Sequence, residues 1–171
     1  MADYNLAITF VLTLEDSSGR GKVTVDSDGT TRYGLLDRWH PDLTTQGFYT
    51  MPADEALVIA KTCYRTQYWN HISGDGITSN IVAAQIFSIA VNDGITWATK
   101  MSQGVLGLVQ DGVLGDQTLT AINSMDPTNF ITAFNMAAKA RYAAIVQAHP
   151  NKVGDLQGWY NRVDLISTFK G

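Results

Sequence analysis

Residues 15–35 read EDSSGRGKVTVDSDGTTRYGL, and this stretch carries most of the information about the fold. Two segments within it, residues 22–25 and 30–35, are rich in β-branched side chains. Asp26-Ser27-Asp28-Gly29 lies between them and is a strong turn signal. The sequence therefore predicts one short β-hairpin here.

The residues before this stretch predict a helix that ends at Glu15. Asp3 is suited to cap it, and the helix would cover residues 4–15. One face of this helix is apolar; it contains Leu6, Phe10, Val11 and Leu14. Glu15 is therefore expected at a helix C-terminus, directly before the hairpin.

The remainder of the chain has mainly helical patterns. Residues 80–91 are apolar nearly all round, which predicts a helix at the centre of the core. Asp126-Pro127 is typical of a helix start, with a cap followed by proline at the first position. Further helices are predicted over residues 50–68 (capped by Thr50), 96–105, 116–122 (capped by Asp116) and 159–169. The expected fold class is mainly α, with one small β-hairpin.

Composition excludes several classes of protein. With 12 Lys and Arg against 16 Asp and Glu, the net charge is −4, which argues against a nucleic-acid-binding protein. The apolar run from Ile81 to Val91 is too short to cross a membrane. A single cysteine, Cys63, excludes an internal disulfide, and three scattered histidines suggest no metal site. We expect no cofactor and no metal. The N-terminus lacks the pattern of a signal peptide, so we expect synthesis in the cytoplasm.

The carboxylates around the predicted hairpin suit the hydrolysis of a glycosidic bond. Such an enzyme needs one protonated carboxyl group as general acid and a second, ionised one beside the sugar. Glu15 is the candidate acid, because the partial negative charge at a helix C-terminus disfavours its ionised form. Asp26, on a solvated turn, is the candidate for the ionised partner.

These residues resemble the N-terminal signature of glycoside hydrolase family 108, phage and bacterial N-acetylmuramidases with a lysozyme-like fold. The resemblance rests on Glu15 followed by residues 26–35, DSDGTTRYGL. It continues through residues 50–56 (TMPADEA), 64–69 (YRTQYW) and 90–94 (AVNDG). Asp16-Ser17-Ser18 departs from the family's Glu-Gly-Gly pattern, and Ser27 and Asp28 replace a proline and a glycine. These departures leave the partner carboxylate open between Asp26 and Asp28.

The second half resembles the peptidoglycan-binding region that accompanies this family. Its pattern appears at Gln103, Leu106-Gly107, Asp111-Gly112, Gly115, Thr118-Leu119 and Ala121-Ile122. The closing segment also matches, at Arg141-Tyr142, Gly158-Trp159 and Arg162. We expect a catalytic lobe over residues 1–92 and a peptidoglycan-binding-like lobe over residues 93–171, packed as one unit. For residues 103–122 we favour a structural role somewhat over a sugar-binding role.

The resemblance implies the cleavage of the β-1,4 bond between N-acetylmuramic acid and N-acetylglucosamine. It assigns Glu15, Asp26 and Thr31 to catalysis, with Thr31 helping to hold the attacking water. We expect Asp28, Tyr33, Trp69 and Asn92 to bind substrate, with Tyr33 and Trp69 exposed in the cleft. A lytic transglycosylase and a non-catalytic peptidoglycan-binding module remain as alternatives.

The expected partners are peptidoglycan glycan strands, acted on by a monomer that does not insert stably into a membrane. Without a signal peptide, such an enzyme would reach the cell wall through holin lesions, as a phage endolysin does, or through a dedicated secretion system.

Overall fold

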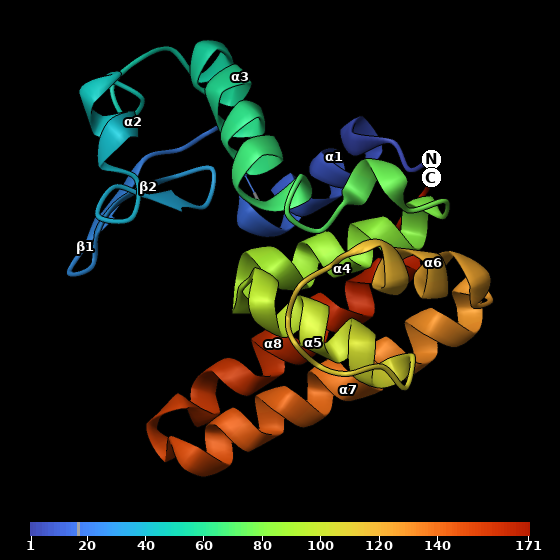
Figure 1. Cartoon of the computed structure of the whole chain (residues 1–171). Helices are drawn as coiled ribbons and strands as arrows, with labels where there is room; N and C mark the ends of the chain where they lie inside the picture. The colour runs from blue at the N-terminus through green and yellow to red at the C-terminus, as the bar shows by residue number, and fades with distance from the viewer. Residues whose placement is uncertain (17) are drawn as a thin grey trace.

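The computed structural model describes residues 1–16 and 18–171, and within these it forms a mainly helical body with a small sheet at one edge beside α2 (Figure 1). The first half contains α1 (Tyr4–Glu15), β1 (Thr24–Asp26), β2 (Gly29–Arg32), β3 (Leu35–Leu36), α2 (Pro41–Thr45) and α3 (Ala53–Tyr64). The second half contains α4 (Asn80–Asp93), α5 (Ile95–Val105), α6 (Asp116–Ser124), α7 (Pro127–Ala148) and α8 (Leu156–Asp164). The prediction of a mainly helical fold with a small β unit is confirmed.

The first helix has the predicted bounds and the predicted cap. The Asp3 carboxylate accepts a hydrogen bond from the Asn5 N–H at 2.7 Å, which satisfies one of the amides left free at a helix N-terminus. The face that contains Ala7, Ile8 and Val11 is buried. Glu15 is the last helical residue, as expected.

The β unit is a three-stranded antiparallel sheet in the order β1-β2-β3, rather than a single hairpin. Thr24 pairs with Thr31, and Asp26 pairs with Gly29 beside the predicted turn. The second strand was expected over residues 30–35, but Tyr33 (φ 49°) and Gly34 (φ 77°) adopt left-handed backbone conformations. This conformation is incompatible with a continuous strand, so the segment splits into β2 and β3.

α4 occupies the centre of the molecule, as its apolar sequence predicts. Nine consecutive residues, Val82–Ala90, are buried. The helix packs against α1 on one side and against α5 and α7 on the other. A single hydrophobic core includes Ile8 of α1, Phe87 of α4 and Phe130 of α7, so both halves of the chain contribute to it.

Some helix boundaries differ from the sequence predictions. The helix expected from residue 50 begins at Ala53, because Thr50 still lies in a turn where its hydroxyl donates to the Gly47 carbonyl. It continues into a π-helical turn, Arg65–Trp69. Gly115 is the cap of α6, and Asp116 is its first residue. The last helix, α8, begins at Leu156 and ends at Asp164, with 3₁₀ turns over Pro150–Asp155 and Leu165–Thr168 on either side.

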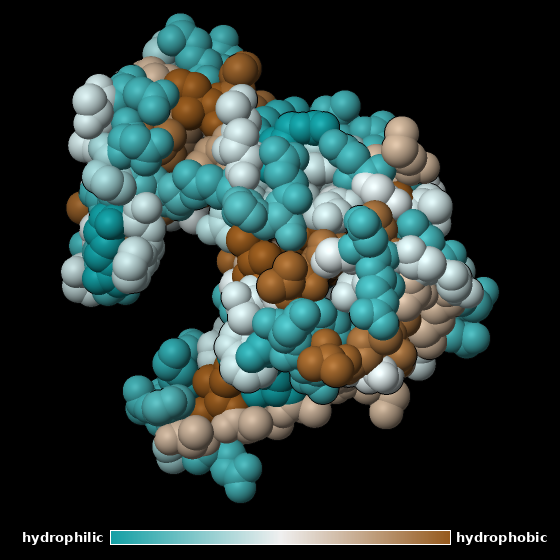
Figure 2. All heavy atoms as spheres, in the orientation of Figure 1, coloured by the Kyte–Doolittle hydropathy of each residue, from teal (hydrophilic) through white to brown (hydrophobic). Residues whose placement is uncertain are grey.

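The surface is deeply hollowed on one side of the molecule. Figure 2 shows a groove between the sheet with α2 and the joined ends of α7 and α8. Figure 1 places the ends of α4 and α5 near its base. Within the described residues, no helix is both long and apolar enough to span a bilayer.

Candidate active site

Glu15, the last residue of α1, contacts both the side of the molecule that contains the sheet and the side that contains α8. On one side it lines a pocket of about 190 Å³ together with Thr31 of β2. Asp16, Ser18, Lys22, Thr24, Arg32, Tyr33 and Gly34 complete the lining. The side chain of Glu15 is 17% exposed, so its carboxyl group is partly desolvated yet still accessible. A sugar ring bound in the pocket would come within reach of it.

On the other side, Glu15 forms an ion pair with Arg162 of α8. The Arg162 Nη2 to Glu15 Oε1 distance is 2.6 Å, and the same nitrogen donates to the Ser88 carbonyl of α4 at 3.1 Å. This contact ties the end of α1 to α4 and α8.

The third contact of Glu15 is with the backbone at Gly34. A Cβ atom at position 34 would lie 2.7 Å from Glu15 Oε2 and 2.7 Å from the Tyr64 hydroxyl oxygen. The Tyr64 hydroxyl donates to the Tyr33 carbonyl at 2.9 Å, which anchors the turn that carries Gly34. Burial raises the pKa of Tyr64 well above its usual range, so this hydroxyl keeps its proton. The turn between β2 and β3 therefore confines the carboxyl group of Glu15.

Asp26 is exposed at the end of β1 and does not line the Glu15 pocket. Its Oδ1 accepts the backbone N–H of Asp28 at 2.8 Å, within the hairpin turn. Thr24, two residues earlier on the same strand, does line the pocket. Alternate residues of a strand point to the same face, so Asp26 faces the same side, about 7 Å further along the strand.

Asp28 lies in the turn, where its carboxylate is 3.7 Å from Arg38 Nη2. Both side chains are more than half exposed, so this ion pair adds little stability. Asp28 is likewise outside the Glu15 pocket.

The expectation that Tyr33 and Trp69 are exposed in the cleft is wrong. Trp69 is fully buried against Tyr4 and Phe87, and its indole N–H donates to Asp75 at 2.8 Å, so no face is left for a sugar. Tyr33 is 6% exposed, and its hydroxyl donates to the Ala53 carbonyl at 2.9 Å. The Tyr33 ring still contributes to the wall of the Glu15 pocket.

Asn92 lies at a second pocket, of about 320 Å³, next to the Glu15 ion pair. This pocket is lined by Thr13, Leu14, Asn92, Gly158, Trp159, Asn161, Arg162 and Leu165. The Asn92 amide donates to the Tyr142 hydroxyl at 2.7 Å, and the ring of Tyr142 stacks on Trp159 at 5.1 Å. Asn92 and a half-buried tryptophan thus lie on the α8 side of Glu15.

The motif at Gln103 forms an internal network. Gln103 is buried, and its amide donates to Asp111 at 2.6 Å and to the Val113 carbonyl at 3.1 Å. Its carbonyl oxygen accepts the Gly112 N–H at 3.0 Å. These contacts hold the loop before α6. They agree with the expectation that residues 103–122 serve a structural role more than a sugar-binding role.

Sequence reasoning missed two parts of the site. Arg162 was matched to the family's closing segment without a role, and its pairing with Glu15 joins positions 147 residues apart. The close approach of Gly34 also depends on tertiary packing, although glycine beside a β-rich segment indicates such an approach. In the described part of the chain, no three His, Cys, Asp or Glu side chains are grouped so as to hold a metal ion.

Comparisons with known proteins identify families that match both halves of the chain. Residues 10–94 match the family model described as glycosyl hydrolase 108, and residues 97–164 match a predicted peptidoglycan domain. Among solved structures, that of Brucella abortus SagA is similar with a TM-score of 0.71 and 26% sequence identity, over 96% of this chain and 91% of that chain. None of the curated proteins matches the chain significantly.

The match to the glycosyl hydrolase 108 model shows a glycoside hydrolase, and the helical fold with a small sheet is lysozyme-like. The chain belongs to the glycosyl hydrolase 108 family, and it is a peptidoglycan hydrolase with a peptidoglycan domain in its second half.

Proposed function

We propose that this hydrolase is an N-acetylmuramidase, which cleaves the β-1,4 bond between N-acetylmuramic acid and N-acetylglucosamine. The observation that supports this best is the position of Glu15, partly desolvated at the groove and held by Arg162 and Gly34. A general acid must be held close to the leaving oxygen while it transfers its proton, and this arrangement meets that need.

In this mechanism Glu15 donates its proton to the glycosidic oxygen as the bond breaks. Positive charge then develops on the sugar ring, and an ionised carboxylate on the other face activates water or stabilises that charge. Asp26 is the proposed partner, because it faces the same side of β1 as the pocket residue Thr24. Thr31 lines the pocket with Glu15 and is proposed to help hold the water.

One observation favours a lytic transglycosylase as the second candidate. Asp26 lies outside the Glu15 pocket, and a transglycosylase needs the acid but no carboxylate that activates water. The products distinguish the two reactions. A muramidase leaves a reducing end, whereas a transglycosylase leaves an anhydro sugar.

The proposed roles are tested by four substitutions, of which those of the three carboxylates keep the shape of the side chain. Glu15→Gln removes the proton donor while keeping the shape, so murein clearing should fall by about 100-fold or more with the circular dichroism spectrum unchanged. Asp26→Asn should cause a comparable loss, and Thr31→Ala a smaller one. If Asp26→Asn is nearly silent while Asp28→Asn is inactive, Asp28 is the partner carboxylate. A Glu15→Gln variant with near wild-type turnover would contradict the assignment of the acid.

The cellular setting is part of the same proposal. We propose that the chain acts as a monomer on glycan strands, with a catalytic lobe over residues 1–92 and a peptidoglycan-binding lobe over residues 93–171. Synthesis in a bacterial cytoplasm and release through holin lesions or a dedicated secretion system would bring it to the wall. Lysis of a host culture only when a holin is co-expressed would support the endolysin route.

A further inference from the structure

We propose that Asp16 is a positioning residue for substrate, which shapes the wall of the Glu15 pocket. This inference rests on the proposed function. Asp16 directly follows the candidate acid and ends α1, with its backbone N–H bonded to the Leu12 carbonyl at 2.9 Å. Its carboxylate turns away from the helix, into the loop that leads to β1.

Both oxygens of the Asp16 carboxylate are used within that loop. Oδ2 accepts the Gly21 N–H at 2.6 Å, and Oδ1 accepts the backbone N–H of Ser18 at 3.2 Å and the Ser18 hydroxyl at 2.5 Å. Although burial acts to raise it, these hydrogen bonds hold the pKa of Asp16 below its ordinary value. The carboxylate is therefore a charged acceptor that joins the start of the loop to its end.

The far end of the loop is connected to the sheet. The Gly21 carbonyl accepts a hydrogen bond from Arg32 Nε at 2.9 Å, and Arg32 is buried in β2. Nη1 of the same arginine donates to the Phe48 carbonyl at 2.7 Å and to the Met51 carbonyl at 2.8 Å. Gly21 also packs on the Tyr33 ring, where a Cβ atom would lie only 2.3 Å from ring atoms. Asp16 thus closes a chain of contacts from α1 to the segment before α3.

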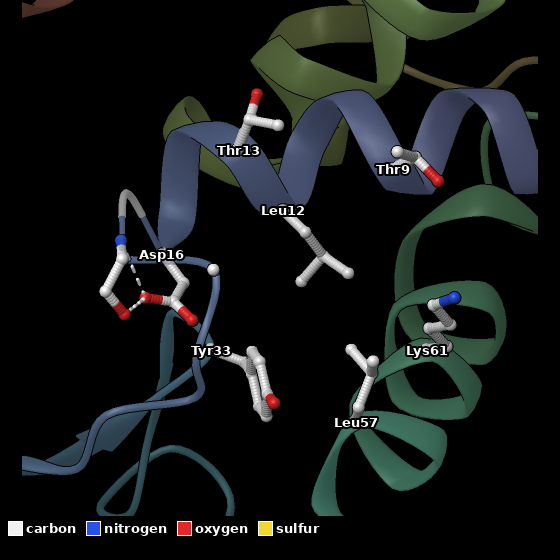
Figure 3. A pocket seen from close by; sticks show the side chains of 9 residues that line it. Thr9, Leu12, Thr13, Asp16, Tyr33, Leu57 and Lys61 are labelled. Carbon is white, nitrogen blue, oxygen red and sulfur yellow. Dashed lines mark hydrogen bonds between the residues drawn. The ribbon is translucent and has the colours of Figure 1, made fainter. Parts of the chain in front are cut away.

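This loop divides two cavities. Asp16, Ser18 and Tyr33 line the Glu15 pocket and also a larger pocket of about 350 Å³ between α1 and α3. In Figure 3 the Asp16 carboxylate and the Tyr33 ring lie at one side of the larger pocket, opposite Leu57 and Lys61 of α3. Without the Asp16 contacts, the loop could move into either cavity, and the wall that a sugar would contact would lose its shape.

Loss of the Asp16 contacts should weaken substrate binding more than it slows the chemical step. The carboxyl group of Glu15 is held independently by Arg162 and Gly34, neither of which bonds to Asp16. Asp16→Ala should therefore raise KM for soluble murein glycan fragments about tenfold while kcat stays within about twofold, as the loss of hydrogen bonds to a charged group suggests. The KM of Asp16→Asn, which keeps one acceptor oxygen, should lie between the KM of the wild type and that of Asp16→Ala.

The matched control is Asp3→Ala, at the other end of the same helix. It removes a carboxylate that accepts one backbone N–H, far from the pocket. This variant should lower Tm and leave KM unchanged. A purely structural role for Asp16 would give the same result, namely a lower Tm at constant KM, and would overturn the inference.

A second readout does not depend on catalysis. Hydrogen exchange of the Gly21 amide, followed by NMR, should speed up in Asp16→Ala and not in Asp3→Ala. If the wild-type protein fails to cleave murein, the proposed function fails, and the inference is then judged by this exchange and by the affinity of the wild-type and Asp16→Ala proteins for the same fragments. Unchanged exchange at Gly21, or unchanged KM or affinity, contradicts the role of Asp16.

Discussion

At Gly34 the backbone lies against Glu15, and no larger residue fits without moving the carboxyl group. Gly34→Ala would place a methyl carbon 2.7 Å from Glu15 Oε2, at a φ of 77° that alanine rarely adopts. We expect a loss of about 1–3 kcal/mol in the free energy of unfolding and a fall in kcat of about 10- to 100-fold. Urea denaturation and murein turnover measure the two effects separately.

The control for Gly34 is Gly107, which has a similar φ of 69° and open space around it, since a Cβ atom there would have nothing within 4 Å. Gly107→Ala should cause a loss of stability without an effect on kcat. Equal effects of both substitutions on kcat would show that backbone strain, rather than contact with Glu15, causes the loss.

Arg162 is the second residue whose substitution tests how Glu15 is held. Arg162→Lys keeps the positive charge, but its side chain is one bond shorter and does not place a nitrogen where Nη2 contacts both Glu15 and the Ser88 carbonyl. We expect a lower kcat and a loss of stability of about 1–3 kcal/mol, read from turnover and urea denaturation. A variant with wild-type kcat would show that Glu15 needs no positioning from α8.

The candidate acid could be identified from sequence because Glu15 lies at the end of a helix with local signals. Its partners could not be derived in this way, because Arg162 and Gly34 meet Glu15 only after the chain has folded. The same limit explains the error at Trp69. An aromatic side chain is equally suited to a sugar-binding cleft and to a core, and in this fold it packs on Phe87.

Among the helices and loops, the Gln103 network is predicted to support the fold rather than to bind murein. Gln103→Leu keeps the approximate size but leaves the Gly112 N–H and one side of Asp111 without this partner. The free energy of unfolding should fall by about 1 kcal/mol, because the half-buried Gly112 N–H loses its acceptor, whereas Asp111 is exposed to water and keeps the Val113 N–H as a partner. Urea denaturation measures this loss, and binding of the folded variant to insoluble murein should be unchanged. A stable variant that no longer binds murein would make Gln103 a ligand residue.

Of the four helix caps predicted from the sequence, Asp3 and Asp126 are confirmed, whereas Thr50 and Asp116 are wrong. Asp3 and Asp126 cap α1 and α7 as expected, since each carboxylate bonds to an amide within three residues. The split of the expected second strand into β2 and β3 was missed. It depends on the left-handed turn at Tyr33 and Gly34, which the Tyr64 hydroxyl holds from another element.

For the molecule as a whole, the burial of His40 allows a prediction of how the free energy of unfolding depends on pH. Burial lowers the pKa of His40 below its ordinary value, against a smaller opposite effect of Asp42. The unfolded chain then binds more protons than the folded protein between about pH 6.5 and the lowered pKa. The free energy of unfolding should therefore decrease as the pH falls through this range.

His40→Asn should make that dependence weaker. Urea denaturation of both proteins at pH 7.5 and pH 5 gives the comparison, and only the difference between their slopes reports on His40, because carboxylates contribute equally to both. Parallel slopes would show that His40 takes up protons equally well in the folded and unfolded states.

Acid-catalysed hydrolysis at N-acetylmuramic acid, with Glu15 as the proton donor, is the reaction on which the proposed function depends. Mass spectrometry of purified murein, digested by the wild-type protein and by Glu15→Gln and then reduced with borohydride, examines it most closely. We expect reducible N-acetylmuramic acid ends from the wild type and an undigested polymer from Glu15→Gln. Anhydro ends or reducing N-acetylglucosamine ends would contradict the muramidase reaction, and the same products from both proteins would show that Glu15 is not the proton donor.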